Sequence, residues 1–270
     1  MLHDFEGAEA LIYVRNGTVV RRLKPAASAR SLRMKASDVL LSLCHANLVR
    51  ILHVSPDGDM HLELMQTSLQ RHMRAGQPCS AGAKLTIARH ATSALQHLHM
   101  QDMQHEDLCP NNILLAWSQG HMHVKLCDFY NEHTGFHHSA AYAAPEVVLL
   151  QATDVTAAAD VWALACCLLF MEGAEPFAGF EHAQAILLYL GTHLCVAFRE
   201  LSTVTQFSLT DCAYGPAKHI AQSMWSDILG CVFVPETSRL SSAEVQHRLD
   251  ALHAPKPLHA RSMLKRLNFE

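Results

Sequence analysis

The stretch His105 to Leu115, with the sequence HEDLCPNNILL, combines residue types that could handle a phosphate. Asp107 is followed five residues later by Asn112 and then by three apolar residues. With this spacing, one loop can aim a carboxylate and a carboxamide at a phosphate and its metal. Cys109 stands between them, where a cation would be expected to neutralise the transferred charge. The stretch therefore predicts either a working phosphoryl-transfer site or the remnant of one.

Length and composition indicate a compact fold that is large enough to position such a loop. The chain has 270 residues, of which half are apolar and 17% are charged. These values exclude a disordered chain and fit one large domain or two lobes around a cleft. The longest apolar run, Val161 to Met171, is about half as long as a membrane helix. We interpret this run as a buried core helix and expect no membrane span.

The N-terminus and the cysteines indicate where the protein works. The first ten residues, MLHDFEGAEA, carry acids where a signal peptide has a basic start and an apolar centre. Nine cysteines without a C-x-x-C pair fit a reducing compartment better than a disulfide framework or a zinc site. We therefore expect an intracellular, cytoplasmic protein.

Charge and histidine content bear on possible partners. A net charge of −4 gives no reason to expect a nucleic-acid partner. The 20 histidines are more unusual, because imidazole titrates at about pH 6.5. The cluster of His133, His137 and His138 leaves a pH switch or a metal site open. Exposed histidines in a histidine-rich chain are the simpler interpretation, because no pair at metal-ligand spacing has a third ligand nearby.

Apolar runs and turn signals predict a small sheet in the first part of the chain. The sequences RNG at Arg15 to Gly17 and SPDGD at Ser55 to Asp59 are typical of hairpin turns. Apolar residues at helical spacing between Ser31 and Leu43 predict one helix beside the sheet. The expected strands are Ala10 to Val14, Thr18 to Leu23, Leu48 to Val54 and Met60 to Leu64.

After Gln66 the pattern changes to long helices. Ser241 and Glu244 have the spacing of a capping box, which predicts that a helix starts there. A small β-rich lobe followed by a helical lobe implies a cleft between the two. The expected helices are Ala81 to Met100, Ala157 to Glu172, His182 to Leu190, His219 to Phe233 and Ser241 to Leu252.

Five motifs occur along the chain in a fixed order. HEDLCPNNILL is followed by KLCDFY at Lys125 to Tyr130, YAAPE at Tyr142 to Glu146, DVWALACCLLFMEGAEPF at Asp160 to Phe177 and VPETSRLSSAEV at Val234 to Val245. Together they closely resemble the helical lobe of the eukaryotic protein kinases, the serine/threonine branch especially, over roughly residues 62–252. The resemblance implies an α+β, bilobal fold with a β-rich N-lobe that carries one helix (about residues 1–64), a hinge (about 63–67), a mainly helical C-lobe (about 68–255) and a basic tail (256–270).

The resemblance also implies roles for the residues of these motifs. Asp107 matches the catalytic Asp that orients the substrate hydroxyl and accepts its proton. Asn112 and Asp128 match the residues that hold magnesium, so ATP and Mg²⁺ are the implied cofactors. The implied nucleotide-binding residues are Gly7 of the glycine-rich loop, Arg21 at the position of the phosphate-binding Lys, Glu63 and Met65 of the hinge, and Ile12 and Leu114, which would enclose adenine.

Further residues match the scaffold of the family. Asp160 matches the Asp that fastens the catalytic loop to a core helix, and Glu146 and Arg239 match a buried ion pair. Ser139 lies where serine/threonine kinases place a hydroxyl near the catalytic Asp. His105 and Phe129 fit an internal apolar spine, together with Leu40 and Ile51.

The departures from the family pattern fall on residues that handle charge. Glu106 replaces the Arg of H-R-D, and Cys109 replaces the Lys that would contact the transferred phosphate. Tyr130 replaces the glycine of D-F-G. Ala36 aligns with the Glu that would pair with the phosphate-binding Lys, unless Asp38 or a shifted register replaces that Glu, and Lys24 is the alternative to Arg21 for the Lys. Switching by loop phosphorylation is then not expected, because a phosphate would meet the Glu106 carboxylate.

Two hypotheses follow. The lost cations favour a pseudokinase, a catalytically impaired protein that acts as a regulatory or binding platform and retains ATP and Mg²⁺ binding. The retained Asp107, Asn112 and Asp128 favour a divergent active serine/threonine kinase that transfers the γ-phosphate of ATP to protein hydroxyls. The expected partner is a protein substrate or another kinase. The sequence GAEA at Gly7 to Ala10 also resembles the phosphate loop of small atypical kinases associated with tRNA modification. This alternative has less support, because those kinases lack the A-P-E segment and the late helices.

Overall fold

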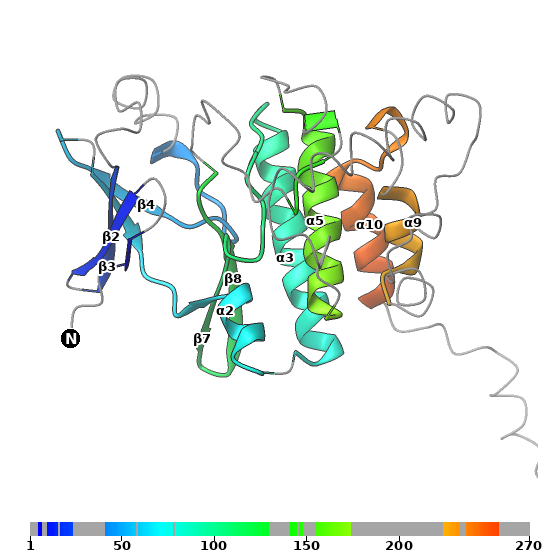
Figure 1. Ribbon diagram of the computed structural model, residues 1–270, viewed down its shortest axis with the longest axis horizontal. Helices are drawn as coiled ribbons and strands as arrows, with labels where there is room; N and C mark the ends of the chain where they lie inside the picture. The colour runs from blue at the N-terminus through cyan, green and yellow to red at the C-terminus, as the bar shows by residue number, and fades with distance from the viewer. Residues whose placement is uncertain are drawn as a thin grey trace, which may run out of the picture.

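The computed structural model describes residues 5–6, 10–15, 17–23, 41–57, 59–77, 79–129, 141–144, 146–147, 155–173, 224–232 and 236–253. Within these residues, two sheets and then a group of helices follow one another along the long axis of the molecule (Figure 1). The loop with Asp107 and Asn112 lies between the helix Ala81–His99 and the strand Ile113–Ser118 of the second sheet. The fold therefore places this loop between β-rich and helical parts.

The first sheet has five antiparallel strands in the order β1-β2-β3-β5-β4. The hairpin of β2 and β3 turns at Gly17, whose φ of +76° suits a residue without a Cβ. The predicted hairpins and strands are confirmed to within one residue, apart from the strand expected from Leu48. The strands are β1 (Phe5–Glu6), β2 (Ala10–Arg15), β3 (Thr18–Leu23), β4 (Ile51–Val54) and β5 (Met60–Glu63).

The segment just before β4 joins the second sheet instead of the first. This sheet has the order β6-β7-β8, with β6 at Thr67–Ser68, β7 at Ile113–Ser118 and β8 at His121–Leu126. The Val49 N–H donates to the Leu126 carbonyl at 2.8 Å, and the Leu126 N–H donates to the Asn47 carbonyl at 2.8 Å. These bonds form a seam between residues 47–49 and β8. The predicted strand from Leu48 therefore begins only at Ile51, because the preceding backbone groups are paired with β8.

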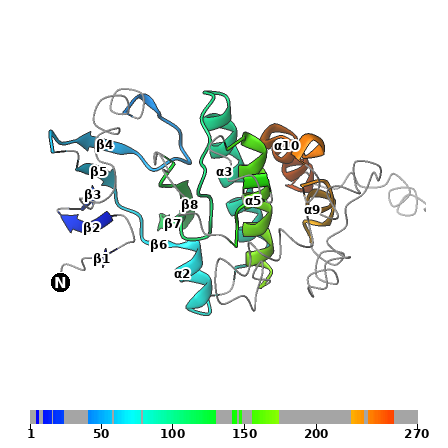
Figure 2. The ribbon, with the colours of Figure 1, turned by 45° about the horizontal axis from the view of Figure 1, so that its top comes forward.

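The helices lie side by side beyond the second sheet, with α3 next to α5 and α10 next to both (Figure 2). The Ser241 N–H donates to Glu244 Oε2 at 2.8 Å, and the Glu244 N–H donates to Ser241 Oγ at 3.3 Å, so the predicted capping box is confirmed. The described helices are α2 (Leu69–Arg74), α3 (Ala81–His99), α5 (Ala157–Met171), α9 (Ser226–Val232) and α10 (Ser242–His253), with a 3₁₀ turn at Glu236–Ser238.

Some predicted segments lie wholly or partly outside the described residues. The helix expected at residues 182–190, the histidine cluster at His133, His137 and His138, and the basic tail are among them. Of the helix expected at residues 31–43, the described Leu41 and Ser42 are helical. Among the described helices, none combines the length and the apolar character that crossing a membrane requires.

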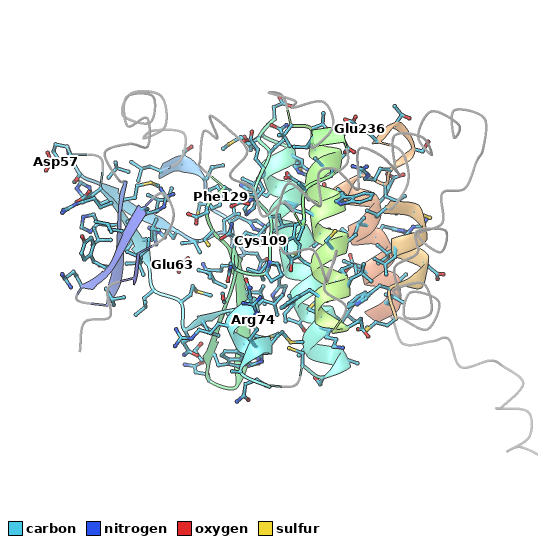
Figure 3. The ribbon with its side chains drawn as sticks, in the orientation of Figure 1. Asp57, Glu63, Arg74, Cys109, Phe129 and Glu236 are labelled. Atoms are coloured by element: carbon cyan, nitrogen blue, oxygen red, sulfur yellow. The ribbon has the colours of Figure 1, made fainter. Side chains whose placement is uncertain are left out.

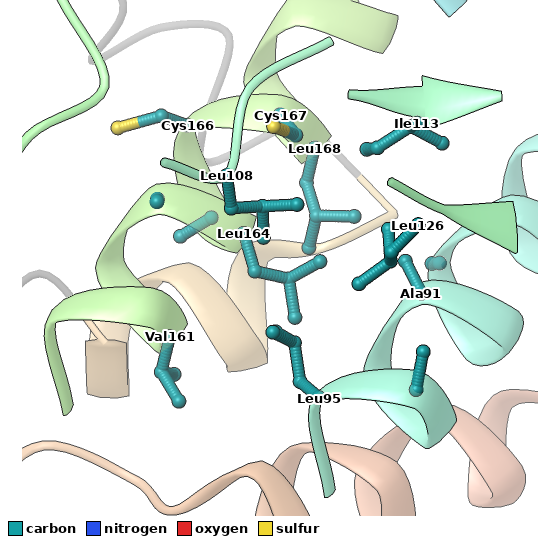
Figure 4. Close-up of a cluster of buried hydrophobic side chains, with 14 of the residues drawn as sticks. Ala91, Leu95, Leu108, Ile113, Leu126, Val161, Leu164, Cys166, Cys167 and Leu168 are labelled. Atoms are coloured by element: carbon teal, nitrogen blue, oxygen red, sulfur yellow. The ribbon is translucent and has the colours of Figure 1, made fainter. Parts of the chain in front are cut away.

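Helix α5 is the centre of the core, as its apolar sequence predicts. Of its residues, all but the first two are buried, including both Cys166 and Cys167. Leu164 and Leu168 point toward Leu95 of α3 and toward Leu108 of the predicted catalytic loop, residues 105–112 (Figure 4). The loop that carries Asp107 is therefore packed directly on the most buried helix of the fold.

Truncation of Leu168, whose side chain is 1% exposed, should lower the free energy of unfolding. We expect Leu168→Ala to cost about 2–5 kcal/mol, because it removes buried methyl groups and leaves a cavity. Leu252→Ala on α10 is the matched control, since Leu252 is 45% exposed. Urea unfolding of both variants measures the difference, and equal losses would contradict the assignment of α5 as the core.

Among the described histidines, His45, His90 and His105 have pKa values below the ordinary value. Burial lowers the pKa of His45, and so do the stacked ring of His97, whose centroid is 4.8 Å away, and Lys125. The Asn47 N–H donates to His45 Nδ1 at 3.2 Å, which requires an unprotonated nitrogen. Burial also lowers the pKa of His90 beside Arg89 and His123, and that of His105 despite the attraction of Asp160.

These shifts predict that the protein loses stability in mild acid. In the unfolded chain the same histidines bind protons at about pH 6.5, whereas in the folded chain they bind them only at lower pH. The stability is therefore fully present above the unfolded pKa and is lost as the pH falls through the lowered folded pKa values. Urea midpoints measured above and below this window should show the loss. His90→Phe should reduce it, whereas the same change at the exposed His121 should not, and a midpoint that rises on acidification would contradict the assignment.

Candidate functional site

The carboxylate of Asp160 holds the catalytic loop in place. Asp160 lies in the first turn of α5 and is 2% exposed. Its Oδ2 accepts the backbone N–H of His105 at 2.8 Å, and its Oδ1 accepts that of Glu106 at 2.9 Å. Glu106 has a φ of +66°, a strained conformation for a residue with a Cβ. The buried carboxylate stabilises this strained turn, which directs the chain into Asp107.

Asn112 closes the same loop. Its Nδ2 donates to the backbone carbonyl of Asp107 at 2.8 Å and to Asp107 Oδ2 at 3.1 Å. The Asn112 carbonyl accepts the N–H of Cys127 at 3.0 Å, which ties the loop to the residue before Asp128. The structure therefore brings Asp107, Asn112 and Asp128 together through hydrogen bonds around Asn112, although their catalytic roles stay predictions.

Asp128 faces a cation of the five-stranded sheet. Its φ is +60°, and its Oδ1 lies 3.4 Å from Nε of Arg21. The Arg21 side chain is 5% exposed and that of Asp128 is 31% exposed, so the pair is largely removed from water. The sequence predicts that Arg21 contacts a phosphate and that Asp128 contacts a metal. In the structure their side chains form an ion pair between the five-stranded sheet and the segment that follows β8.

The strand register explains why Arg21 points to this side of the sheet. Ile12 on β2, Arg21 on β3 and Met60 on β5 lie directly opposite one another in the antiparallel ladder. Directly opposed residues place their side chains on the same face. Arg21 and Met60 are buried and Ile12 is half-buried, so the face that carries Arg21 and the predicted adenine contact Ile12 is the inner one.

The predicted hinge residues lie where the two sheets meet. Glu63 Oε1 accepts the Arg50 N–H at 2.7 Å and forms an ion pair with Lys125 Nζ at 2.6 Å. The carboxylate of Glu63 is thus part of a contact between β5 and β8. Met65 and Leu114 are half-buried against the hydrophobic core.

The predicted scaffold ion pair is formed. Arg239 Nη2 donates to Glu146 Oε2 at 3.1 Å, and Nη1 donates to the Ala158 carbonyl at 2.8 Å. The guanidinium lies 5.1 Å above the ring of Trp162. Because Arg239 is 8% exposed, these contacts satisfy a buried charge and join the segment at Glu146 to α5.

Inside this arrangement lie Cys109, which departs from the family pattern, and Phe129 and His105, which match it. Cys109 is 3% exposed, and Phe129 is 4% exposed. Figure 3 places both, with Glu63, between the five-stranded sheet and α5. His105 is 1% exposed, which fits a position in an apolar spine. Gly7 and Ser139, together with Ala36, Leu40 and Tyr130, lie outside the described residues.

The sequence reasoning missed His99. Its Nε2 lies 2.8 Å from Asp160 Oδ2, and its Nδ1 lies 2.9 Å from Ser242 Oγ on α10. His99 therefore joins three helices at the carboxylate that holds the loop. A signal was present, because His99 follows Leu95 by four residues and so lies on the buried face of α3.

A pocket opens beside Asp107. It is formed by the catalytic loop, the segment around Tyr142 and the first turns of α5. Two half-buried acids, Glu106 and Asp107, give it negative character. Its lining residues are Glu106, Asp107, Leu108, Tyr142, Ala143, Ala144, Val147, Val155, Ala159, Asp160 and Ala163.

The predicted magnesium ligands, Asn112 and Asp128, both contact other side chains of the protein in this arrangement. Asp128 Oδ1 faces the Arg21 guanidinium, and Asn112 Oδ1 lies 4.0 Å from Sγ of Cys127. Burial raises the pKa of the Cys127 thiol well above its ordinary value, so this thiol stays protonated and can donate weakly to Asn112. Among the described residues, no three His, Cys, Asp or Glu side chains form a group that could hold a metal ion.

Comparisons with known proteins agree on one family. The family described as "Protein kinase domain" matches residues 24–249. Mitogen-activated protein kinase 3 of Arabidopsis thaliana is 30% identical over 172 residues, which cover 57% of this chain and 45% of the relative. Mitogen-activated protein kinase homolog NTF6 of Nicotiana tabacum is 29% identical over 174 residues, which cover 58% and 46%. The chain thus spans less than half the length of these relatives.

A solved structure shows the same fold. The crystal structure of Rad53 1-466 in complex with AMP-PNP matches with a TM-score of 0.63 and 21% sequence identity, covering 92% of this chain and 65% of that chain. The likeness confirms the predicted α+β, bilobal fold.

Removal of the Asp128 charge should destabilise the protein. We expect Asp128→Asn to lower the free energy of unfolding by about 1–3 kcal/mol, because it takes a charged partner from the buried Arg21. The matched control is Asp59→Asn, which weakens the neighbouring pair of Arg22 and Asp59, where the arginine side chain is 56% exposed. Chemical denaturation should show a clearly smaller loss for the control, because exposed ion pairs contribute little. Equal losses would mean that burial of Arg21 adds nothing to the pair.

Proposed function

The chain belongs to the protein kinase family, and we propose that within it this protein is a pseudokinase that binds ATP between its lobes and acts as a platform for a protein partner. Phosphoryl transfer is impaired in this proposal. The partner is a protein substrate or another kinase, as the mitogen-activated protein kinases among its relatives suggest.

The burial of Cys109 carries the proposal. The loop that holds Asp107 and Asn112 places this side chain at 3% exposure. The family pattern requires a Lys ammonium here, and a thiol supplies no fixed positive charge to the transferred phosphate. Loss of one preorganised charge typically costs about 2.7–4 kcal/mol of transition-state stabilisation, a factor of about 10² to 10³ in rate.

Glu106 works in the same direction. It lines the pocket beside Asp107, so a carboxylate stands where the family pattern has a guanidinium. A phosphorylated segment near this pocket would be repelled instead of bound. At this position the chain therefore offers a phosphorylated loop a carboxylate instead of a cation, so we do not expect loop phosphorylation to switch on catalysis.

ATP binding is supported by a different set of residues. Arg21 keeps a permanent positive charge on the inner face of the sheet. Ile12 lies on the same face, opposite Arg21 in the strand register. Met65 and Leu114 are half-buried against the core. These residues match the family's nucleotide contacts, so we expect adenine and phosphates to bind between the sheet and the catalytic loop.

One observation favours an active serine/threonine kinase instead. The hydrogen bonds from Asn112 to Asp107, and from the loop backbone to Asp160, keep the catalytic loop in a single arrangement. A protein that acts only as a platform does not need this arrangement. In this second proposal, Asp107 accepts the proton of a protein hydroxyl that attacks the γ-phosphate of ATP.

A phosphotransfer assay separates the two. The wild type and Asp107→Asn are incubated with labelled ATP and mixed protein substrates, with the Arabidopsis relative as positive control. We expect both proteins to transfer phosphate at the same background rate, at least about 10²-fold below the control, because the cationic groups are missing. Transfer by the wild type that disappears in Asp107→Asn would overturn the pseudokinase and establish the active kinase.

A further inference from the structure

A β-bulge brings two histidines face to face on the five-stranded sheet. β4 and β5 pair Ile51 with Leu62 and then His53 with His61, so Leu52 is an extra residue in β4. Leu52 is 44% exposed, as expected for a side chain that bulges out of the ladder. In a regular ladder Leu52 would lie opposite His61. The bulge therefore turns His53 toward His61.

The pair lies on the outer face of the sheet, away from the predicted nucleotide contacts. His61 is directly opposite Val20, whereas the next residue, Arg21, lies opposite the buried Met60 on the inner face. The His53 residue is exposed and His61 is half-buried. β4 forms one edge of the sheet, at the end of the molecule far from α9 and α10 (Figure 2). An ion in solution can therefore reach the pair from outside the sheet.

The two rings are spaced as the ligands of one metal ion would be. Their centroids are 5.5 Å apart, and their planes are inclined by 48°. A zinc ion at about 2.0–2.1 Å from one nitrogen of each ring would hold the centroids roughly 5 Å apart at a tetrahedral angle. Among the described residues, neither ring forms a hydrogen bond, so an ion would displace no partner there. A small side-chain rotation converts the observed spacing into the liganded one.

The acids two residues away on β5 are engaged elsewhere. Asp59 Oδ2 lies 2.6 Å from Nη2 of Arg22, and Glu63 Oε1 lies 2.6 Å from Nζ of Lys125. The described part of the chain has no group of three metal-ligating side chains. The histidine pair therefore offers two imidazoles and leaves the other positions of an ion to water. Imidazole suits dications such as Zn²⁺, Cu²⁺ and Ni²⁺, whereas Mg²⁺ and Ca²⁺ require oxygen ligands.

We propose that His53 and His61 form a binding site for a zinc-like divalent ion, which two imidazoles and water hold on the outer face of the sheet. The bound ion joins the edge strand β4 to β5 across the bulge. The site is independent of the ATP binding proposed above, because Arg21 and Ile12 lie on the opposite face.

Titration with Zn²⁺, followed by NMR of the histidine rings in a reductant without thiols, tests the site. The signals of His53 and His61 are identified by their loss in His53→Asn and in His61→Asn. In the wild type both signals should shift with one dissociation constant. Either substitution should weaken Zn²⁺ binding at the remaining ring by at least about tenfold, because two linked ligands bind one ion more tightly than a single ligand does.

His121 on β8 is the matched control, since it is also exposed. Its ring should require at least about tenfold more Zn²⁺ than the pair, and His121→Asn should leave the shared constant unchanged. Mg²⁺ at the same concentrations should shift none of the three rings.

The two single variants serve as independent tests, so one is sufficient if the other does not fold. A shared constant that is lost on substitution of either partner and kept in His121→Asn would support the site. Separate constants for the two rings, or a shift at one ring that survives substitution of the other unchanged, would overturn it. An absence of shifts at both rings would overturn it as well, and the bulge would then serve packing alone.

Discussion

The buried carboxylate of Asp160 is the interaction on which the catalytic region depends. A charge that is 2% exposed would be costly without partners. It receives two backbone N–H groups of the catalytic loop and the ring of His99, and through these bonds it holds Glu106 in a strained conformation. The loop keeps its shape through its backbone, so the side chains at Glu106 and Cys109 could change without loss of the loop.

Elsewhere in the helical lobe, too, the contacts that hold the fold are made by residues other than those predicted to act on phosphate. Arg239 joins Glu146, the Ala158 carbonyl and the ring of Trp162, and each of these contacts is structural. Glu106 and Cys109, which depart from the family pattern, stand where that pattern has cations. A fold stabilised by buried backbone and scaffold contacts can therefore persist when its cations are replaced.

Much of the fold could be predicted from the sequence. The hairpin at Gly17, the apolar run of α5 and the capping box at Ser241 are local signals, and each predicted its element within a residue or two. The strand expected at Leu48 was wrong at its start, because local pattern does not show that Leu48 and Val49 bond to β8. Tertiary pairing decided that boundary.

The candidate site could be predicted only in part from the sequence. Asp107, Asn112 and Asp128 could be named because motif spacing locates them in the chain. The pairing of Arg21 with Asp128 could not, since the two residues lie far apart in sequence and only the folded sheet register brings them together. The position of His99 against Asp160 was hidden for the same reason, although its spacing from Leu95 placed it on the buried face.

The seam between residues 47–49 and β8 has a mechanical consequence. Among the described residues, the five-stranded sheet is joined to the second sheet through residues 64–66, by the hydrogen bonds at Asn47 and Val49, and by the ion pair of Glu63 and Lys125. A rotation of the sheet about this seam is the motion that would disturb these contacts least. Arg21 is carried by the sheet, whereas Asp128 follows β8 on the other side of the seam. A rotation of the sheet about the seam would change the distance between these two side chains, and their ion pair opposes it.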